Sequence, residues 1–259
     1  MITAPFQRGT VLFTSSNLPD VKPPEDRDME LREHIAELRD RVIKAVIPFF
    51  IVLGLFFYRS DHIITYLWRN LFGEKEMVVY SPPEYIITRI LISAFMAFII
   101  TYPWIIYQIY IFMKPGLYEH ERRFLKLVFP FSYISFIVGA MLSYFLILPV
   151  LYSTFVIEYF GAEPYLSVRE SLRNSIKLTL SIGLAFQIPT ATLVSVKLRL
   201  TSSKWLKEKR LLIYIAVFIL ATNITFDITG LSQMIILTAV VVMYELSILI
   251  AKIFEGGEK

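Results

Sequence analysis

The chain contains no cysteine among its 259 residues and only 3 histidines. It therefore forms no disulfide, offers no thiolate to a metal and has no thiol nucleophile, which excludes several classes of enzyme. A phosphate-binding Gly-x-x-x-x-Gly-Lys loop is also missing, so energy for any transport has to come from partners or from a membrane gradient. We predict no cofactor and no metal site.

Charged residues are scarce at 19% of the chain, whereas hydrophobic residues make up 56% and aromatic residues 15%. Together with a mean hydropathy of +0.58, this composition is typical of a membrane protein. The length suits one compact bundle, and no repeat of about 20 to 50 residues is visible. The net charge of +4 is modest and the basic residues lie beside apolar runs, which argues against nucleic acid as a partner.

The sequence predicts an all-α polytopic membrane fold in which six helices cross the bilayer. The expected spans lie near residues 42–58, 86–113, 125–152, 175–197, 210–226 and 231–252. They form one membrane domain, 29–254, between a flexible tail (1–28) and a short tail (255–259). An amphipathic interfacial helix is expected over 29–42, and a polar segment outside the bilayer over 59–83. The fifth and sixth spans are expected to be short, with local thinning of the bilayer.

Prolines inside the apolar runs predict bent helices. Pro48, Pro103 and Pro189 are expected to kink their spans and so to give the bundle a concave surface. Because Pro48 has no backbone N–H, the carbonyl of Lys44 has to find another partner unless the helix kinks. Pro115-Gly116 predicts a helix end inside the charged stretch 112–126, where we expect the function.

Basic residues divide unequally between the two sides of the predicted bundle. Six spans place both termini on one side, which carries 19 Lys and Arg, against 7 on the other. Cytoplasmic segments of membrane proteins carry the excess of positive charge. We therefore predict a multi-pass protein of the cytoplasmic membrane with both termini in the cytoplasm.

Three motifs occur in a characteristic order. Residues 34–41 read His-Ile-Ala-Glu-Leu-Arg-Asp-Arg, residues 82–85 read Pro-Pro-Glu-Tyr, and residues 103–123 contain Pro-Trp-Ile-Ile-Tyr-Gln followed by Pro-Gly-Leu-Tyr-Glu-His-Glu-Arg-Arg. Over roughly residues 29–254 the chain resembles the TatC family, the polytopic subunit of the twin-arginine protein translocase. The resemblance implies a receptor for twin-arginine signal peptides, and not an enzyme.

The resemblance also implies partners and an energy source. Such a receptor recruits single-span subunits of the TatA type, and of the TatB type where present, and it self-associates among membrane lipids. Folded cargo proteins then cross the cytoplasmic membrane at the expense of the proton-motive force.

By motif position, the family roles fall on residues near the ends of the first and second spans. Glu37 and Glu121 would receive the two arginines, and the remaining residues would shape the site: Arg39, Phe112, His120, Arg122 and Arg123. A guanidinium binds a carboxylate bidentately whereas lysine is a point charge, so two carboxylates can distinguish Arg-Arg from Lys-Lys. Because an exposed ion pair contributes only about 0 to 1 kcal/mol, a partly desolvated groove and the apolar part of the peptide must add affinity.

The two carboxylates also have simpler interpretations. Taken alone, Glu121 reads as a solvated residue paired with Arg122, with Lys126 or with lipid headgroups. Glu37 reads equally well as the partner of Arg41, one helical turn further on.

Four polar residues are predicted to make contacts with partners or inside the membrane: Gln108, Gln187, Asp227 and Glu245. Gln187 stands where many relatives have a glutamate, and a glutamine cannot ionise. Its alternative role is to satisfy helix carbonyls near Pro189, including that of Ala185. Glu245 is expected to face protein or water, because a carboxylate at the bilayer centre costs a few kcal/mol or more.

Two features of the sequence bear on other classes of protein. A membrane metalloprotease is disfavoured, because residues 120–124, His-Glu-Arg-Arg-Phe, lack the second histidine of a His-Glu-x-x-His zinc motif. A secondary transporter with its substrate site at the kinked helices and Glu245 is the alternative function, but no duplicated half supports it.

Overall fold

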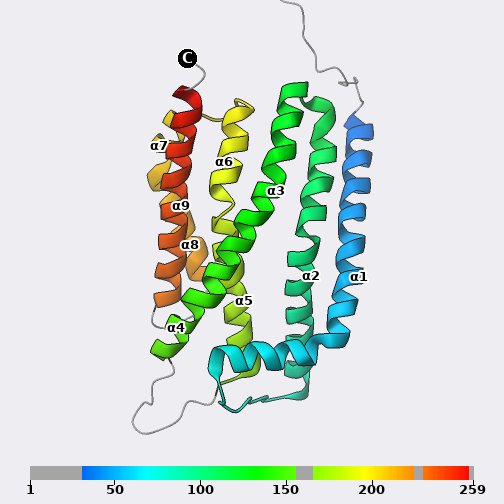
Figure 1. Ribbon diagram of the computed structural model, residues 1–259, viewed down its shortest axis with the longest axis vertical. Coiled ribbons are helices and arrows are strands. Elements are labelled where there is room, and N and C mark those ends of the chain that lie inside the picture. The colour runs from blue at the N-terminus through cyan, green and yellow to red at the C-terminus, as the bar shows by residue number, and fades with distance from the viewer. Residues whose placement is uncertain (1–30, 156–165, 225–229, 257–259) are drawn as a thin grey trace, which may run out of the picture.

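The computed structural model describes residues 31–155, 166–224 and 230–256. In this part of the chain the helices are α1 (Leu31–Phe72), α2 (Pro82–Met113), a 3-10 turn η1 (Lys114–Gly116), α3 (Glu119–Leu142), a π-helical segment η2 (Ser143–Ile147), α4 (Leu148–Phe155), α5 (Val168–Ala185), α6 (Ile188–Lys197), α7 (Ser203–Glu208), α8 (Arg210–Ile224) and α9 (Leu231–Gly256). The all-α fold is confirmed. The start of α1 and the end of α9 lie at the same end of the bundle, uppermost in Figure 1, which we call the terminal end.

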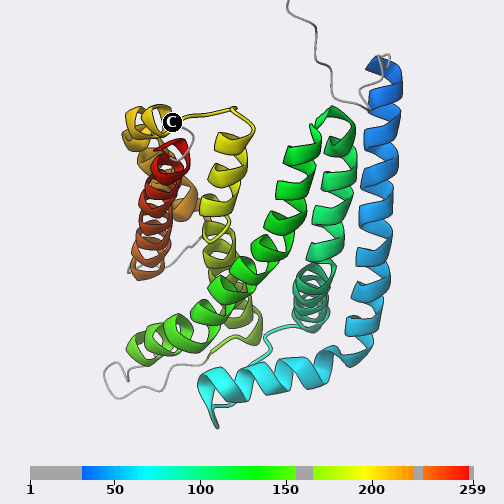
Figure 2. The ribbon, with the colours of Figure 1, turned by 45° about the horizontal axis from the view of Figure 1, so that its top comes forward.

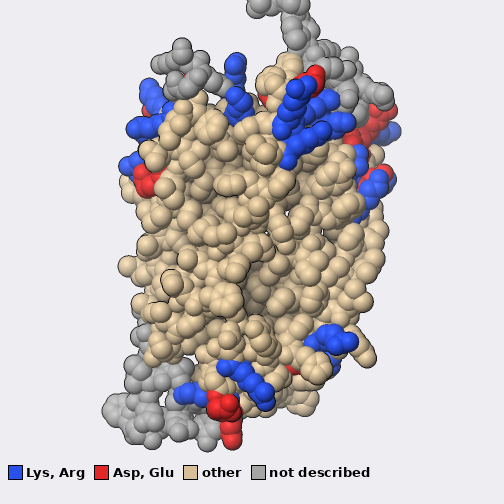
Figure 3. Space-filling view, viewed as in Figure 1, with Lys and Arg blue, Asp and Glu red and all other residues tan. Residues whose placement is uncertain are grey.

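Helix length and composition match a multi-pass membrane protein. Five described helical runs are long and apolar enough to cross a membrane, namely 32–72, 82–116, 119–153, 168–197 and 231–255. A sixth apolar helix, α8, has 15 residues and is about 22 Å long, shorter than a hydrocarbon core of roughly 30 Å. Figure 3 shows charged side chains gathered at the two ends of the molecule, with an uncharged belt between them on this face.

Helix α1 is longer than the sequence indicated. It runs without interruption through the expected interfacial helix and first span and continues to Phe72, where a polar segment had been expected from Arg59 onward. The reason is an apolar stripe in that segment: Ile64, Trp68 and Phe72 recur every four residues and are all buried. They pack with Ile92 and with residues of α5 in one core cluster.

The second half of α1 turns across the end opposite the terminal end (Figures 1 and 2). Arg89 of α2 holds this part of α1. Its guanidinium donates to the Phe57 carbonyl at 3.0 Å and to the Ser60 hydroxyl at 2.7 Å, and lies 3.3 Å from Asp61. The Ser60 hydroxyl also donates to the Phe57 carbonyl, at 2.8 Å. Side-chain donors inserted at a helix carbonyl are a common cause of helix bending.

The first half of α1 packs against α2, and one polar contact joins them at Pro48. The indole N–H of Trp104 donates to the Lys44 carbonyl at 2.8 Å. This is the carbonyl that Pro48, four residues later, cannot engage because it has no N–H. The partner that the sequence required for Lys44 is therefore supplied by the neighbouring helix. Pro48 and Pro103 both lie inside uninterrupted helices.

The fourth membrane-crossing run is divided in two. Helix α5 begins at Val168, earlier than expected, because the Ser167 hydroxyl accepts the Glu170 N–H and caps its first turn. It ends at Ala185, and Pro189 lies in the first turn of α6, so the break falls at residues 186–187. The Ser135 hydroxyl of α3 donates to the Phe186 carbonyl at 2.8 Å, which satisfies an acceptor that the break exposes.

Two further boundaries differ from expectation. Only residues 114–118 leave the α-helical conformation in the charged stretch 112–126, because Glu119 already begins α3. At the other end of the chain, α9 has 26 residues and continues through charged positions to Gly256, so the sixth helix is longer than predicted.

Helices α3 and α5 cross through small residues. A Cβ placed on Gly183 would lie 2.7 Å from the ring of Phe136, and one placed on Gly139 would lie 2.8 Å from the ring of Phe186. Close helix approach at small residues is the usual basis of helix packing in membranes, where lipid provides no hydrophobic driving force between helices.

The glycine contact predicts a stability difference. Gly183→Ala should lower the free energy of unfolding by about 1 to 3 kcal/mol, because the buried Phe136 ring has to move. Gly54→Ala is the matched control, since no atom lies within 4 Å of its added Cβ, and it should be neutral or stabilising. Thermal unfolding of the two variants in detergent measures the difference. Equal losses would contradict the close crossing.

The Trp104 contact predicts an energetic coupling to Pro48. Trp104→Phe removes the donor to the Lys44 carbonyl and should cost about 1 kcal/mol or more. In a Pro48→Ala background the alanine N–H can take over that carbonyl, so the same substitution should cost much less. A double-mutant cycle on unfolding free energies measures the coupling. If the two effects simply add, the indole does not compensate for the hydrogen bond that Pro48 removes from the Lys44 carbonyl.

Candidate functional site

The residues of the first motif lie at the terminal end of α1, against the last turn of α2. His34 stacks on Phe112, with ring centroids 4.7 Å apart and an angle of 30° between the rings. This contact joins the first motif to the end of α2, although the two residues are far apart in sequence. The structure thus places Phe112, a predicted site residue, next to the start of the amino-terminal motif.

Glu37 has a partner within its own helix. Its carboxylate accepts a hydrogen bond from the Arg41 guanidinium at 3.2 Å, and both side chains are mostly buried. Arg39 points elsewhere: it is exposed and lies 3.6 Å from Asp40. Glu37 therefore makes the contact that its simpler interpretation predicted, an ion pair with Arg41 one helical turn further on.

An apolar groove of about 470 Å³ runs between α1 and α2 beside this pair. Its walls are formed by residues of both helices: Leu38, Arg41, Val42, Ala45, Val46, Phe49, Ile105, Gln108, Ile109 and Phe112. Arg41 thus faces the groove while it pairs with Glu37. The His34–Phe112 stack and the Glu37 carboxylate accordingly lie at one end of an apolar channel.

Gln108 is the uncharged polar residue of that groove. It is only 4% exposed, and its Oε1 atom has no hydrogen-bond partner among the described residues. A buried acceptor without a donor costs about 1 to 3 kcal/mol.

Glu121 lies in the first turn of α3, where its Oε2 atom accepts the Tyr118 N–H at 2.9 Å. A carboxylate at this position caps the helix start and interacts favourably with the helix dipole. The Arg122 Nε atom donates to the Leu117 carbonyl at 3.0 Å, which fixes the chain between η1 and α3. Glu121 thus helps to build the turn, a role that the sequence did not indicate.

The neighbouring charged residues of α3 are more exposed. Arg123 pairs with Glu119 one turn earlier, and the ring of His120 stacks on that of Tyr118 at 5.9 Å. Figures 1 and 2 place the end of α2 between the terminal ends of α1 and α3. The two helices that carry Glu37 and Glu121, α1 and α3, therefore flank the end of α2 at the same end of the molecule.

Gln187 lies at the break between α5 and α6 and contacts α3. The Ser132 hydroxyl donates to the Oε1 atom of Gln187, and the Gln187 side-chain amide donates to the Ser132 carbonyl at 3.1 Å. Its amide is thus used across helices, where the alternative interpretation had placed it at carbonyls of its own helix. A neutral amide suits this contact because it both accepts and donates.

Glu245 on α9 faces α8. The Arg210 guanidinium contacts both of its oxygens, at 2.9 and 3.0 Å, and the Tyr214 hydroxyl donates to Oε1. The hydrogen bond from the Arg210 Nη2 atom is charge-assisted, and together with the close contact of Nε it reduces the cost of an isolated carboxylate. The fourth predicted polar contact, Asp227, lies outside the described residues.

Sequence reasoning missed several residues that hold the site. Trp104, Ser132 and Tyr214 act through contacts between helices. Trp104 belonged to a recognised motif, but its hydrogen bond to α1 was not indicated, and no pattern in the sequence marks Ser132 or Tyr214. Arg41 belonged to a recognised motif, but its position in the groove depends on the packing of α1 against α2.

Comparison with known proteins agrees with this geometry. A family profile described as Sec-independent protein translocase protein (TatC) matches residues 33–239. TatC of Methanocella arvoryzae is 31% identical over 234 residues, covering 89% of this chain and 96% of its own. TatC of Aquifex aeolicus is 32% identical over 238 residues, covering 89% and 98%.

A solved structure gives the same result. The crystal structure of a twin-arginine translocase receptor, TatC, superposes with a TM-score of 0.76 and 30% sequence identity, and covers 85% of this chain and 98% of its own. Fold, motif order and sequence identity thus agree over most of the molecule, and the chain belongs to the TatC family of Sec-independent protein translocase proteins.

Proposed function

We propose that this translocase protein is the receptor for twin-arginine signal peptides, and that the groove between α1 and α2 is its binding site. The observation that carries the proposal is the juxtaposition of Glu37 with the groove through Arg41. One carboxylate beside an apolar groove matches a peptide in which arginines precede an apolar segment. The apolar segment supplies the affinity that a surface ion pair lacks.

Arginine binding at Glu37 is an exchange of partners. In the free protein Arg41 makes one contact of 3.2 Å with the carboxylate. An incoming arginine can offer two parallel N–H donors to the same carboxylate, which is a stronger arrangement, whereas a lysine offers a single point of charge. Arg41 then moves away from Glu37, and selectivity for arginine follows from the geometry of the fork.

The peptide's apolar part would lie along the groove towards Gln108. The second arginine is received by Glu121, with His120, Arg122 and Arg123 beside it on α3, while Arg39 lies on α1 with Glu37. Because Glu121 also caps α3, binding of an arginine to Glu121 would alter the hydrogen bond that holds the turn between α2 and α3.

The proposed topology and partners follow from charge and family. The terminal end faces the cytoplasm, since 19 of the 26 Lys and Arg residues belong to that side. TatA-type and TatB-type single-span subunits and further copies of this chain assemble around the receptor, in a non-enzymatic translocase that the proton-motive force drives. Gln187 and Glu245 would offer such partners polar contacts inside the membrane. Because Gln187 cannot ionise, coupling to protons would not pass through that side chain.

The receptor proposal predicts a preference for arginine that depends on two carboxylates. A twin-arginine signal peptide should bind the purified protein about tenfold more tightly than its twin-lysine variant, and Glu37→Gln or Glu121→Gln should remove most of that preference. Glu119→Gln, one position from His120 and paired only with exposed Arg123, is the matched control. Equal binding of both peptides would refute the proposal, as would a preference that survives both substitutions.

The exchange mechanism predicts that Arg41 competes with the peptide. Arg41→Gln should tighten twin-arginine binding severalfold, because Glu37 no longer has to leave an internal partner. The same peptide titration measures this, with Arg39→Gln as the comparison of equal charge. Weaker binding in the Arg41 variant would mean that Arg41 contacts the peptide instead of blocking it.

A further inference from the structure

The second half of α1 packs an apolar stripe into the core and has a polar face on its other side. The residues of this face recur every three or four positions, so they are neighbours along the helix. They line an open depression of about 480 Å³ and are His62, Thr65, Tyr66, Arg69 and Asn70. We call this depression the opposite-end pocket. Because one helix face supplies all five residues, their side chains border a single space.

The polar groups of the opposite-end pocket are accessible. His62, Tyr66 and Arg69 are all exposed. Within the described ranges, neither the imidazole of His62 nor the guanidinium of Arg69 makes a hydrogen bond or an ion pair. The two residues lie about 10 Å apart along the helix axis, a distance that the long arginine side chain and a lipid headgroup can bridge together. Both side chains are therefore available to an external partner.

The lining of this pocket favours an anion. It includes the guanidinium of Arg69 and no carboxylate. Asp61, next to His62 in the chain, is engaged elsewhere, because its carboxylate lies 3.3 Å from Arg89 and accepts the Tyr85 hydroxyl at 2.6 Å. An arginine, an imidazole and a phenol all offer N–H or O–H donors, and such donors bind anionic oxygens.

The pocket lies where the uncharged belt of the molecule ends. The second half of α1 lies across the end of the bundle, and Figure 3, in the same view as Figure 1, shows basic side chains at the lower border of the belt. Tyr66 in the pocket is 69% exposed, and Tyr58, two turns earlier, is 79% exposed. Tyrosine is enriched where membrane meets water. This position brings the pocket to the level of lipid headgroups.

Apolar surface continues from the pocket onto η2. The Asn70 side-chain amide donates to the Tyr144 hydroxyl at 2.7 Å, which joins the last turn of α1 to this segment. The ring of Tyr144 lies against that of Phe145, with centroids 4.9 Å apart, and Phe145 is 63% exposed. A soluble anion would gain nothing from Phe145, whereas a lipid whose headgroup fills the pocket would cover it with an acyl chain.

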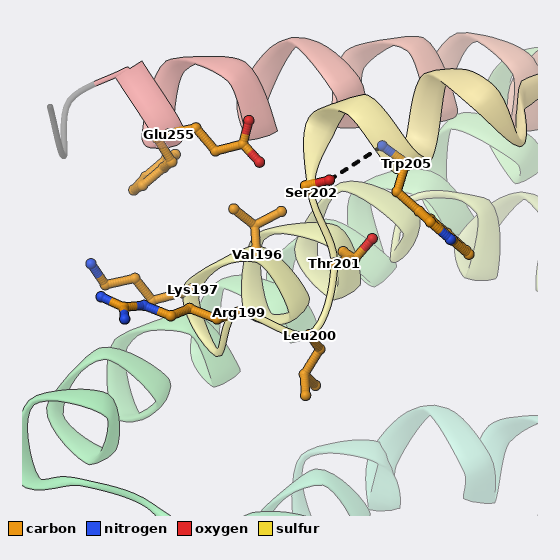
Figure 4. Close-up of a pocket in the computed structure, with 9 residues that line it drawn as sticks. Val196, Lys197, Arg199, Leu200, Thr201, Ser202, Trp205 and Glu255 are labelled. Carbon is orange, nitrogen blue, oxygen red and sulfur yellow. Dashed lines mark hydrogen bonds between the residues drawn. The ribbon is translucent and has the colours of Figure 1, made fainter. Parts of the chain in front are cut away.

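A pocket at the terminal end provides a contrast. It has a volume of about 460 Å³ and lies at the end of α6 and the link to α7. Figure 4 shows the side chains of Lys197 and Arg199 extending together, away from Thr201, and the Glu255 carboxylate lines the same pocket. Its polar groups do not converge, so its arginine is a control for the effect of positive charge alone.

We propose that the opposite-end pocket binds the phosphodiester headgroup of an anionic membrane phospholipid. Arg69 pairs with the phosphate, the His62 N–H and the Tyr66 hydroxyl donate to oxygens of the headgroup, and an acyl chain lies over Phe145. Such a lipid would fasten the second half of α1 to one leaflet. On the topology proposed above this leaflet faces away from the cytoplasm, but the binding itself does not depend on the orientation or on peptide recognition.

The full chain, purified in a neutral detergent, tests the proposal by titration with phosphatidylglycerol, phosphatidylcholine and glycerophosphoglycerol, the last being the headgroup without acyl chains. Native mass spectrometry counts bound lipid, and thermal unfolding measures the stabilisation. Phosphatidylglycerol should bind and raise the unfolding temperature, and the other two should not. If phosphatidylcholine binds equally, the charge argument fails; if the bare headgroup binds equally, the membrane lipid is not the ligand.

Variants separate the pocket from charge in general. Arg69→Gln should weaken phosphatidylglycerol binding about fivefold, the effect of one cation near a membrane surface, and Arg69→Lys should retain most of the binding. His62→Phe keeps a ring but removes the N–H donors, and it should also weaken binding. Arg59→Gln, at an exposed cation of the same helix outside the pocket, and Arg199→Gln, at the terminal end, are the controls and should stay within about twofold of the original.

Folding is checked on the same samples. Because His62 and Arg69 are exposed, their variants should unfold at nearly the original temperature without lipid, so weaker binding reports the site and not the fold. Unchanged binding in both Arg69→Gln and His62→Phe would overturn the proposal. Equal weakening by Arg59→Gln or Arg199→Gln would overturn it as well, because the lipid would then respond to charge anywhere on the surface.

Discussion

The structure depends on how helices inside a membrane satisfy the backbone carbonyls that their bends and breaks release. Lipid offers no donor to such a carbonyl, so another part of the protein has to supply one. Three such cases occur along the chain. The Trp104 indole donates to the Lys44 carbonyl, one turn before Pro48. Arg89 donates to the Phe57 carbonyl where α1 bends, and Ser135 donates to the Phe186 carbonyl at the break after α5. Each donor comes from a neighbouring helix, and each contact therefore also fixes how two helices pack.

The groove is a product of these contacts. The first half of α1 packs against α2 and is otherwise exposed, so its position depends on the indole of Trp104 in the middle and on the His34–Phe112 stack at the terminal end. Between these two points the helices leave an apolar channel with one unsatisfied amide. A helix that packs on one side only can adapt to a ligand more readily than a helix in the core, which suits a site that has to accept peptides of different apolar sequence.

Charge is concentrated at the terminal end and serves more than one purpose there. At α1 positive and negative charges are balanced within the protein, because Arg41 pairs with Glu37. This arrangement suits a cationic ligand that replaces an internal partner. The excess of positive charge at the same end also orients a membrane protein in the bilayer.

The sequence by itself determined the all-α membrane fold, the unequal distribution of charge and the family motifs, because hydrophobic length and local order are properties of consecutive residues. It also identified the problem at Lys44, since the effect of Pro48 is local. It did not indicate that α1 would continue to Phe72. Ile64, Trp68 and Phe72 are separated by polar and charged residues, so they form an apolar stripe only when the segment is known to be helical. The partner of Lys44, the contact between Gln187 and Ser132, and the ion pair between Arg210 and Glu245 were decided by tertiary structure alone, because each joins residues whose proximity depends on how whole helices pack.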